Sequence, residues 1–107
     1  MEHQKENFSK SIEKIKSELM AIGPMRPGNI NEQFKDPEAK TGSYYQLNYT
    51  HKLKTKTEYV RKPMLEAMIA ETQEYKKFKT LIDKWIEISI QASKHRVYKE
   101  KEALKNN

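Results

Sequence analysis

The stretch from residue 44 to residue 60, YYQLNYTHKLKTKTEYV, decides the fold of this 107-residue chain. Its side chains alternate in type, and the first part places on one face of a β-strand Tyr45, Leu47 and Tyr49. Residues 53–60 alternate in the same way and have the composition of a second strand. The link between the two runs is short, so the sequence predicts an antiparallel hairpin, although no Asn-Gly or Asp-Gly pair marks its turn.

The segment before this hairpin could add a third strand. Ile30 and Phe34 lie four residues apart, a spacing that fits one face of a short strand and equally a single helical turn. Turn-forming residues follow in the sequence DPEAKTG. We therefore predict a small antiparallel sheet of two or three strands over residues 29–61, with a loop over residues 35–43.

Helical patterns flank the predicted sheet on both sides. In residues 4–22 the apolar side chains recur at helical spacing, at Phe8, Ile12, Ile15, Leu19 and Ile22. The Gly-Pro pair at residues 23–24 ends this helix, because glycine caps helices well and proline cannot continue the hydrogen-bond ladder. A second apolar stripe, with a proline at its start, predicts a long helix over residues 63–92. Residues 93–107 form a basic tail that is either helical or frayed.

These elements predict a helix-dominated α+β fold with an N-terminal helix, a small antiparallel sheet and a long C-terminal helix. A chain of this length has room for one domain, so we treat residues 1–107 as a single domain. Only 36% of the residues are hydrophobic and none is cysteine, so a small core has to stabilise the fold without disulfides. The long helix is apolar on more than one face, which predicts a homodimer with a coiled-coil interface at Trp85, Ile86 and Ile90.

Positive charge is concentrated in two short stretches of a chain whose formal net charge is +6. Residues 51–62 contribute +4, from five basic side chains and one acidic, and residues 94–107 contribute +3, from five basic and two acidic. Such a local excess is typical of proteins that bind nucleic-acid phosphates or an acidic protein surface, and it also occurs on ordinary lysine-rich surfaces. The candidate nucleic-acid-binding residues are Lys52, Lys54, Lys56, Arg61, Lys62, Lys94 and Arg96.

Two features of the hairpin each allow two interpretations. Lys52, Lys54 and Lys56 follow at intervals of two and are expected on one strand face, where they either bind phosphate or protect an edge strand from aggregation. Four tyrosines are interleaved with these lysines, namely Tyr44, Tyr45, Tyr49 and Tyr59. The tyrosines either stack on bases, or all but Tyr44 form the apolar face of a thin sheet that covers the long helix.

Catalysis has little support in the sequence. His3, His51 and His95 have no metal-ligand spacing, and the three glycines cannot form a phosphate-binding loop. No cysteine is present to act as a nucleophile or to bind zinc. We therefore expect a non-enzymatic protein with no catalytic residue, no metal site, no cofactor and no small-molecule substrate. No apolar run is long enough to cross a membrane and no secretory signal is recognisable, so we expect a cytoplasmic protein.

Three motifs occur in a characteristic order along the chain. IGPMRPGNI at residues 22–30 follows the first helix, GSYYQLNY at residues 42–49 opens the hairpin, and YKKFKTL at residues 75–81 lies in the long helix. Over residues 10–92 this arrangement resembles a family of small uncharacterised bacterial and archaeal proteins that are often encoded near transposases and other mobile elements. Members of that family carry a cysteine knuckle where this chain has a plain loop at residues 34–42. The resemblance therefore implies a mobile-element or phage setting, and it does not extend to a metal-dependent function.

These observations predict a small non-enzymatic nucleic-acid-binding protein, a DNA-binding protein of a mobile element or phage, whose dimeric helical scaffold presents basic hairpins. The alternative is a protein-interaction module, an adaptor or inhibitor of phage or mobile-element origin, that docks an acidic protein surface. A third interpretation is a structural coiled-coil subunit of a larger assembly. The three interpretations differ in the partner, which is nucleic acid, an acidic protein or further copies of the chain.

Overall fold

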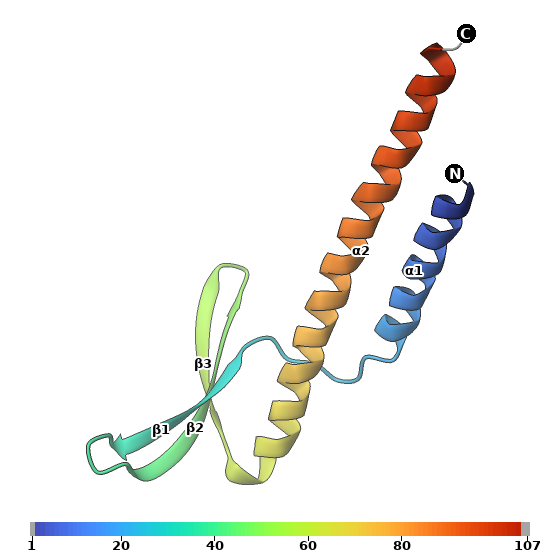
Figure 1. The fold of residues 1–107 in the computed structure, drawn as a ribbon. Coiled ribbons are helices and arrows are strands. Elements are labelled where there is room, and N and C mark those ends of the chain that lie inside the picture. Colours follow the sequence, from blue (N-terminus) through green and yellow to red (C-terminus); the bar gives the residue numbers. More distant parts are fainter. Residues whose placement is uncertain (1, 106–107) are drawn as a thin grey trace. The chain divides into compact units, whose positions relative to one another are not determined.

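The computed structural model describes residues 2–105, with side chains from residue 7 onward. Its elements follow in the order α1 (Glu2–Met20), β1 (Asn29–Asp36), β2 (Thr41–His51), β3 (Lys54–Val60), a short 3-10 helix (Lys62–Met64) and α2 (Leu65–Lys105), as Figure 1 shows. This order confirms the predicted α+β fold with an N-terminal helix, an antiparallel sheet and a long C-terminal helix. The chain forms two compact units, which we call the helical unit (residues 1–21 and 78–107) and the sheet unit (residues 22–77).

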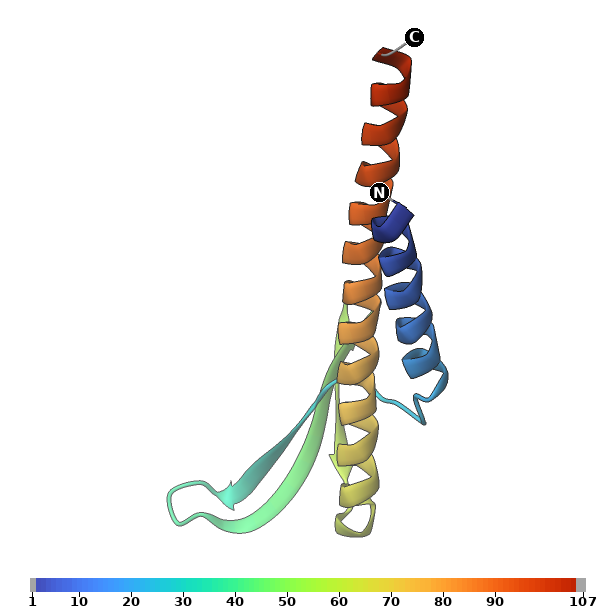
Figure 2. The ribbon, with the colours of Figure 1, turned by 45° about the vertical axis from the view of Figure 1, so that its right-hand side comes forward.

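The helical unit is an antiparallel pair formed by α1 and the part of α2 that begins at Phe78. The ring of Phe8 in α1 lies 6.1 Å from that of His95, and Lys16, two turns later in α1, lies over Trp85. Figures 1 and 2 both show the two helices side by side. Along one face of α2, partly or fully buried residues recur at alternating spacings of four and three. They are Leu81, Trp85, Ile88, Ala92, His95 and Lys99. Burial of this stripe against α1 forms the core of the helical unit.

The sheet unit contains a three-stranded antiparallel sheet in the order β1-β2-β3. Leu47 of the central strand lies opposite Ile30 of β1 and Glu58 of β3. Residues opposite one another share a face of the sheet, and residues two positions along a strand share it too. We call the face with Ile30, Leu47, Glu58 and Val60 the inner face and the opposite one the outer face. Leu47 is fully buried and Val60 is 4% exposed, so the inner face carries the core of this unit.

The first turns of α2 lie against the inner face of the sheet. Val60 borders a hollow together with Met68, and Ile30 borders another together with Ile69 and Thr72. Thr72 is 5% exposed, and its hydroxyl donates a hydrogen bond to the carbonyl of Ile69 at 2.8 Å. The buried hydroxyl is therefore satisfied within its own helix.

The predicted loop over residues 35–43 is too long. The ladder between β1 and β2 continues until Asp36 lies opposite Thr41, so the loop contains only residues 37–40. A carboxylate oxygen of Asp36 accepts a hydrogen bond from the backbone N–H of Ala39 at 3.2 Å, an Asx-type turn that lets the strands pair up to the loop. The segment around Ile30, which the sequence left between strand and helical turn, is a strand.

The helix ends also differ from their predicted positions. α1 ends at Met20 instead of residue 22, and α2 begins at Leu65, after a 3-10 turn that contains Pro63. α2 then continues as one helix to Lys105, so the described part of the basic tail, residues 93–105, is helical. Its contact face extends past the predicted end at residue 92 because His95 packs on an aromatic side chain of α1, a partner that the sequence of the tail does not reveal.

The turn between β2 and β3 consists of Lys52 and Leu53, whose φ angles are 52° and 66°. Positive φ at both central positions is typical of the type I′ turn, which normally contains Asn-Gly. β3 therefore starts at Lys54, one residue later than predicted, and Lys52 lies in the turn. The prediction that Lys52 shares a strand face with Lys54 and Lys56 is wrong, because a tight turn without Asn-Gly could not be recognised in the sequence.

Candidate nucleic-acid interface

The tip of the β2–β3 hairpin is basic and exposed. Lys52 lies in the turn, and Lys54 and Lys56 follow in β3, all three exposed. Among residues 7–105 no carboxylate forms an ion pair with any of these lysines. Like charges this close repel one another, so the tip favours a ligand that supplies negative charge.

Glu58, the acidic residue of this hairpin, already has a partner. Its carboxylate forms an ion pair with the guanidinium of Arg26, which comes from the segment between α1 and β1. The same guanidinium lies over the ring of Tyr49, 5.1 Å from its centroid. Because the carboxylate of Glu58 is paired with Arg26, it does not neutralise the lysines of the tip. Sequence reasoning missed Arg26 because the two paired residues lie 32 positions apart and no local pattern connects them.

The four tyrosines of the hairpin divide between the two faces of the sheet. On the inner face, the hydroxyl of Tyr45 donates to a carboxylate oxygen of Glu32 at 3.0 Å, and this hydrogen bond, with the negative charge of Glu32, raises the pKa of Tyr45. Tyr49 shares the inner face. Tyr44 and Tyr59 lie on the outer face with ring centroids 6.5 Å apart. The interpretation that Tyr59 shares a face with Tyr45 and Tyr49 is therefore wrong, because the two-residue turn sets the opposite register.

The outer face of β2 and β3 is polar but uncharged. Between the turn and the Tyr44–Tyr59 pair it contains Gln46, Asn48, Thr50, Thr55 and Thr57. The hydroxyls of Thr50 and Thr55 are 2.9 Å apart, and Thr57 donates to the side-chain oxygen of Asn48 at 2.7 Å. Charged residues make up 34% of the chain, yet none lies on this face of the two strands. These side chains are exposed or half-buried, so the face is open to a ligand.

The other predicted basic residues lie elsewhere. Arg61 continues the extended backbone of β3, and Lys62 begins the 3-10 helix, at the end of β3 opposite to the tip. Lys94 and Arg96 lie on α2 in the helical unit. All four side chains are exposed. The predicted site residues therefore occupy the tip, the far end of β3 and α2, and the tip alone gathers three of them.

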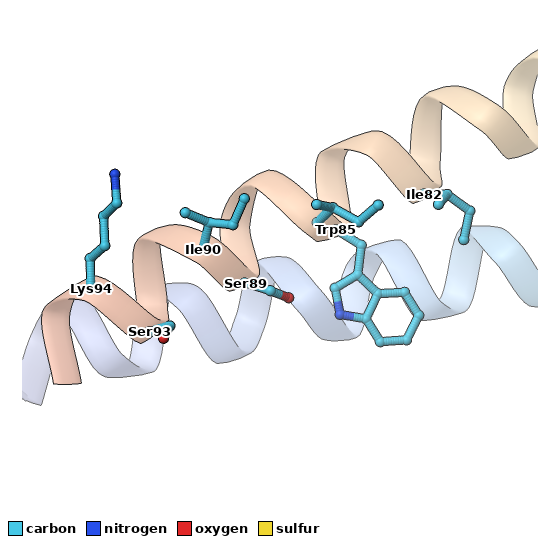
Figure 3. Close-up of a pocket in the computed structure, with 7 residues that line it drawn as sticks. Ile82, Trp85, Ser89, Ile90, Ser93 and Lys94 are labelled. Carbon is cyan, nitrogen blue, oxygen red and sulfur yellow. The ribbon is translucent and has the colours of Figure 1, made fainter. Parts of the chain in front are cut away.

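The predicted dimer residues belong to a groove along α2 in the helical unit. Its lining, shown in Figure 3, consists of Ile82, Trp85, Ile86, Ser89, Ile90, Ser93 and Lys94. Ile86 is 53% exposed and Ile90 is 49% exposed, whereas Trp85 is half-buried with the ammonium of Lys16 5.5 Å from its ring centroid. Neighbouring apolar side chains with this much exposed surface are typical of a face that contacts another chain.

The described part of the chain has neither a cluster of metal-binding side chains nor a membrane-spanning helix. Among residues 7–105 no three His, Asp or Glu side chains come close enough together to hold a metal ion. None of the described helices combines the length and the apolar composition that crossing a bilayer requires.

No protein-family model, curated protein or solved structure matches the chain. The resemblance to the mobile-element family, which depends on the order of three sequence motifs, therefore stays a prediction.

Proposed function

We propose that the chain is a small, cytoplasmic, non-enzymatic protein that binds nucleic acid through the basic tip of its β2–β3 hairpin. The observation that supports this most directly is the exposure of Lys52, Lys54 and Lys56 without a carboxylate partner, while Glu58 is engaged by Arg26. A row of phosphates supplies the missing negative charge. When lysines neutralise these phosphates, the nucleic acid releases its bound counterions, and this release favours binding.

A homodimer formed through the α2 groove is the second part of the proposal. The exposed apolar surfaces of Ile86 and Ile90 support it, since a second copy would remove them from water. Two copies present two hairpins, and a ligand long enough to meet both is bound more tightly than one hairpin could bind it. The mobile-element or phage setting belongs to the same proposal and depends on the sequence motifs alone.

Replacing Lys52, Lys54 and Lys56 together by Glu tests the role of the tip. We expect this variant to lose binding to a mixed-sequence 20-nucleotide DNA, offered both as duplex and as single strand and measured by fluorescence anisotropy. The matched control replaces Lys10, Lys14 and Lys77 by Glu, since all three are exposed and the change in net charge is the same. The control should keep most of the affinity because its hairpin is unaltered.

The salt dependence of binding gives a second readout. Each phosphate contact contributes about 0.7 to 0.9 to the slope of log K against log salt concentration. Replacing the three tip lysines by Gln should therefore reduce that slope by about 2 to 3, if each lysine meets one phosphate. Full binding by the Glu variant, or an equal loss in variant and control, would refute the assignment to the tip.

Docking of an acidic protein to the same tip is the second candidate function, favoured by the same unpartnered lysines, because carboxylates supply the missing negative charge as phosphates do. Both candidate functions predict sensitivity to salt, so salt alone cannot separate them. Capture from a nuclease-treated lysate can separate them. A protein partner that survives the digestion and is lost in the Lys-to-Glu tip variant would support the docking module over nucleic-acid binding.

A further inference from the structure

We infer that the outer face of the sheet binds unpaired bases of a single-stranded nucleic acid, with the Tyr44–Tyr59 pair as the stacking platform. This inference depends on the proposed function and adds two things to it: the form of the nucleic acid and a set of contacts separate from the basic tip. It follows from the aromatic pair, from the hollow beside it and from the chemistry of the face between this pair and the tip.

The aromatic pair is open to a ligand. Tyr59 is 66% exposed, and the ring of Tyr44 lies beside it at 6.5 Å with an interplanar angle of 37°. The other two hairpin tyrosines are engaged on the inner face, Tyr45 by the carboxylate of Glu32 and Tyr49 by the guanidinium of Arg26. Of the four, Tyr44 and Tyr59 are the pair whose rings lie on the outer face, where a base can stack.

A shallow hollow adjoins this pair and carries a positive charge. Its lining consists of Lys35, Gly42, Ser43, Tyr44 and Tyr59. At Gly42 a side chain would place its Cβ 3.0 Å from the Cβ of Lys35, so glycine keeps this part of the hollow free. The ammonium of Lys35 can meet a phosphate while the attached base stacks on the tyrosines. Exposed Arg61, next along the extended chain after Val60, offers a second cation near Tyr59.

The polar side chains of the outer face between the tyrosines and the tip are suited to hydrogen bonds with the edges of bases. Asn, Gln and Thr side chains donate and accept hydrogen bonds without a net charge, as the edges of bases do. The cross-strand bonds of Thr57 with Asn48 and of Thr50 with Thr55 hold several of these groups in place. From Tyr59 to Lys54 the strand covers five steps, about 17 Å at roughly 3.3 Å per residue. A single strand that stacks on the tyrosines can therefore reach Lys52 in the turn within a few nucleotides, while Lys54 and Lys56 belong to the inner face.

Single-stranded nucleic acid is favoured over duplex because of the stacking platform. In a duplex the bases are paired and stacked on one another, and their faces are closed to a protein side chain. Unpaired bases expose those faces, and stacking on aromatic side chains is a usual way in which proteins bind them. A free nucleotide offers the same base and phosphate but cannot extend to the tip, so it should bind far more weakly than an oligonucleotide.

The experiment compares two single strands that carry the same phosphates: a 12-nucleotide oligothymidylate and an abasic oligodeoxynucleotide of the same length. Wild-type protein should bind the oligothymidylate about 5- to 150-fold more tightly, from the usual contribution of one stacked base. Tyr59→Ala should remove most of this preference, and Tyr59→Phe should keep it, because stacking needs the ring and not the hydroxyl. Tyr98→Ala is the matched control, since Tyr98 is 60% exposed on α2 in the helical unit.

Each outcome bears on one of the two claims. If wild-type protein binds both oligonucleotides equally well, or prefers a duplex of equal length, base stacking is overturned while binding by the tip stands. If wild-type protein binds neither single strand nor duplex, the proposed function fails and the inference fails with it. An unchanged preference in Tyr59→Ala, with folding verified by circular dichroism, would also overturn the inference. If Tyr59→Ala does not fold, Tyr59→Leu, which keeps apolar bulk without the aromatic face, replaces it.

Discussion

Replacement of Gly28 by Ala should destabilise the sheet unit far more than the same change at Gly23. Gly28 precedes β1 and has a φ of 119°, a conformation that residues with a side chain rarely adopt. A Cβ at this position would lie 2.5 Å from the carbonyl oxygen of Asn48, 2.9 Å from the Cβ of Tyr49 and 3.0 Å from the side chain of Leu47. All three residues belong to the central strand, so the clash is with the part of the sheet that has least freedom to move.

Two costs add at Gly28. Backbone strain of this kind costs about 1 to 3 kcal/mol, and overpacking against a rigid neighbour costs about 1 to 3 kcal/mol more. We expect a loss of about 2 to 6 kcal/mol, a large part of the roughly 5 to 15 kcal/mol by which domains are usually stable. At Gly23 an added Cβ would meet nothing within 4 Å. Gly23→Ala should therefore be neutral or stabilise by about 0.5 kcal/mol through the unfolded chain.

Hydrogen exchange of backbone amides is the assay that separates the two units. Protection of the β2 amides should fall in Gly28→Ala, by about 30-fold or more for a loss of 2 kcal/mol, and remain unchanged in Gly23→Ala. Fluorescence of Trp85, the single tryptophan, follows the helical unit during unfolding by urea and identifies an effect that spreads beyond the sheet. Equal protection of β2 in the two variants would refute the close approach of the chain at Gly28.

Three further substitutions test other features of the fold. Ile90→Lys should yield a monomer by light scattering, because a dimer would bury an unpaired charge. Met20→Lys, at an 89% exposed position, is its control. An unchanged mass for Ile90→Lys would count against the interface. Leu53→Gly should stabilise the hairpin by about 0.5 to 1 kcal/mol in urea unfolding, because glycine adopts the positive φ of this turn without strain. A lower stability of this variant would contradict that reasoning. His95→Phe should raise the melting temperature, since Nε2 of His95 is buried without a hydrogen-bond partner beside Phe8; a fall would show that the imidazole is needed.

The elements of the fold could be predicted because the signals that define them are local. Alternation in residues 44–50 identifies the central strand, and Leu47, expected on its apolar face, is the fully buried side chain of the sheet unit. Helical spacing identifies α1, whose Ile15 is 6% exposed as the predicted stripe requires. In both cases the periodicity of the side chains is enough, since burial on one face needs no knowledge of what covers that face.

The register of the hairpin and the partners of its charged residues could not be predicted in the same way. A turn made of Lys52 and Leu53 has no sequence signature, and a shift of one residue moves every side chain of a strand to the opposite face. That is why Tyr59 was expected beside Tyr45. The pair formed by Arg26 and Glu58 is a tertiary contact, and sequence reasoning treated Glu58 only as one negative charge within a basic stretch.

The two faces of the sheet differ in composition because the sheet is small. With three strands and a single covering helix segment in the sheet unit, one face suffices for the core, and strand alternation leaves the opposite face free. A free face that served only solubility would be expected to carry charges of both signs, as the rest of this chain does. Here β2 and β3 carry amides, hydroxyls and an aromatic pair on that face, whereas Lys54, Lys56 and Glu58 lie on the inner face and Lys52 lies in the turn. Solubility alone does not account for that distribution, which is the composition expected of the base-binding face that we infer.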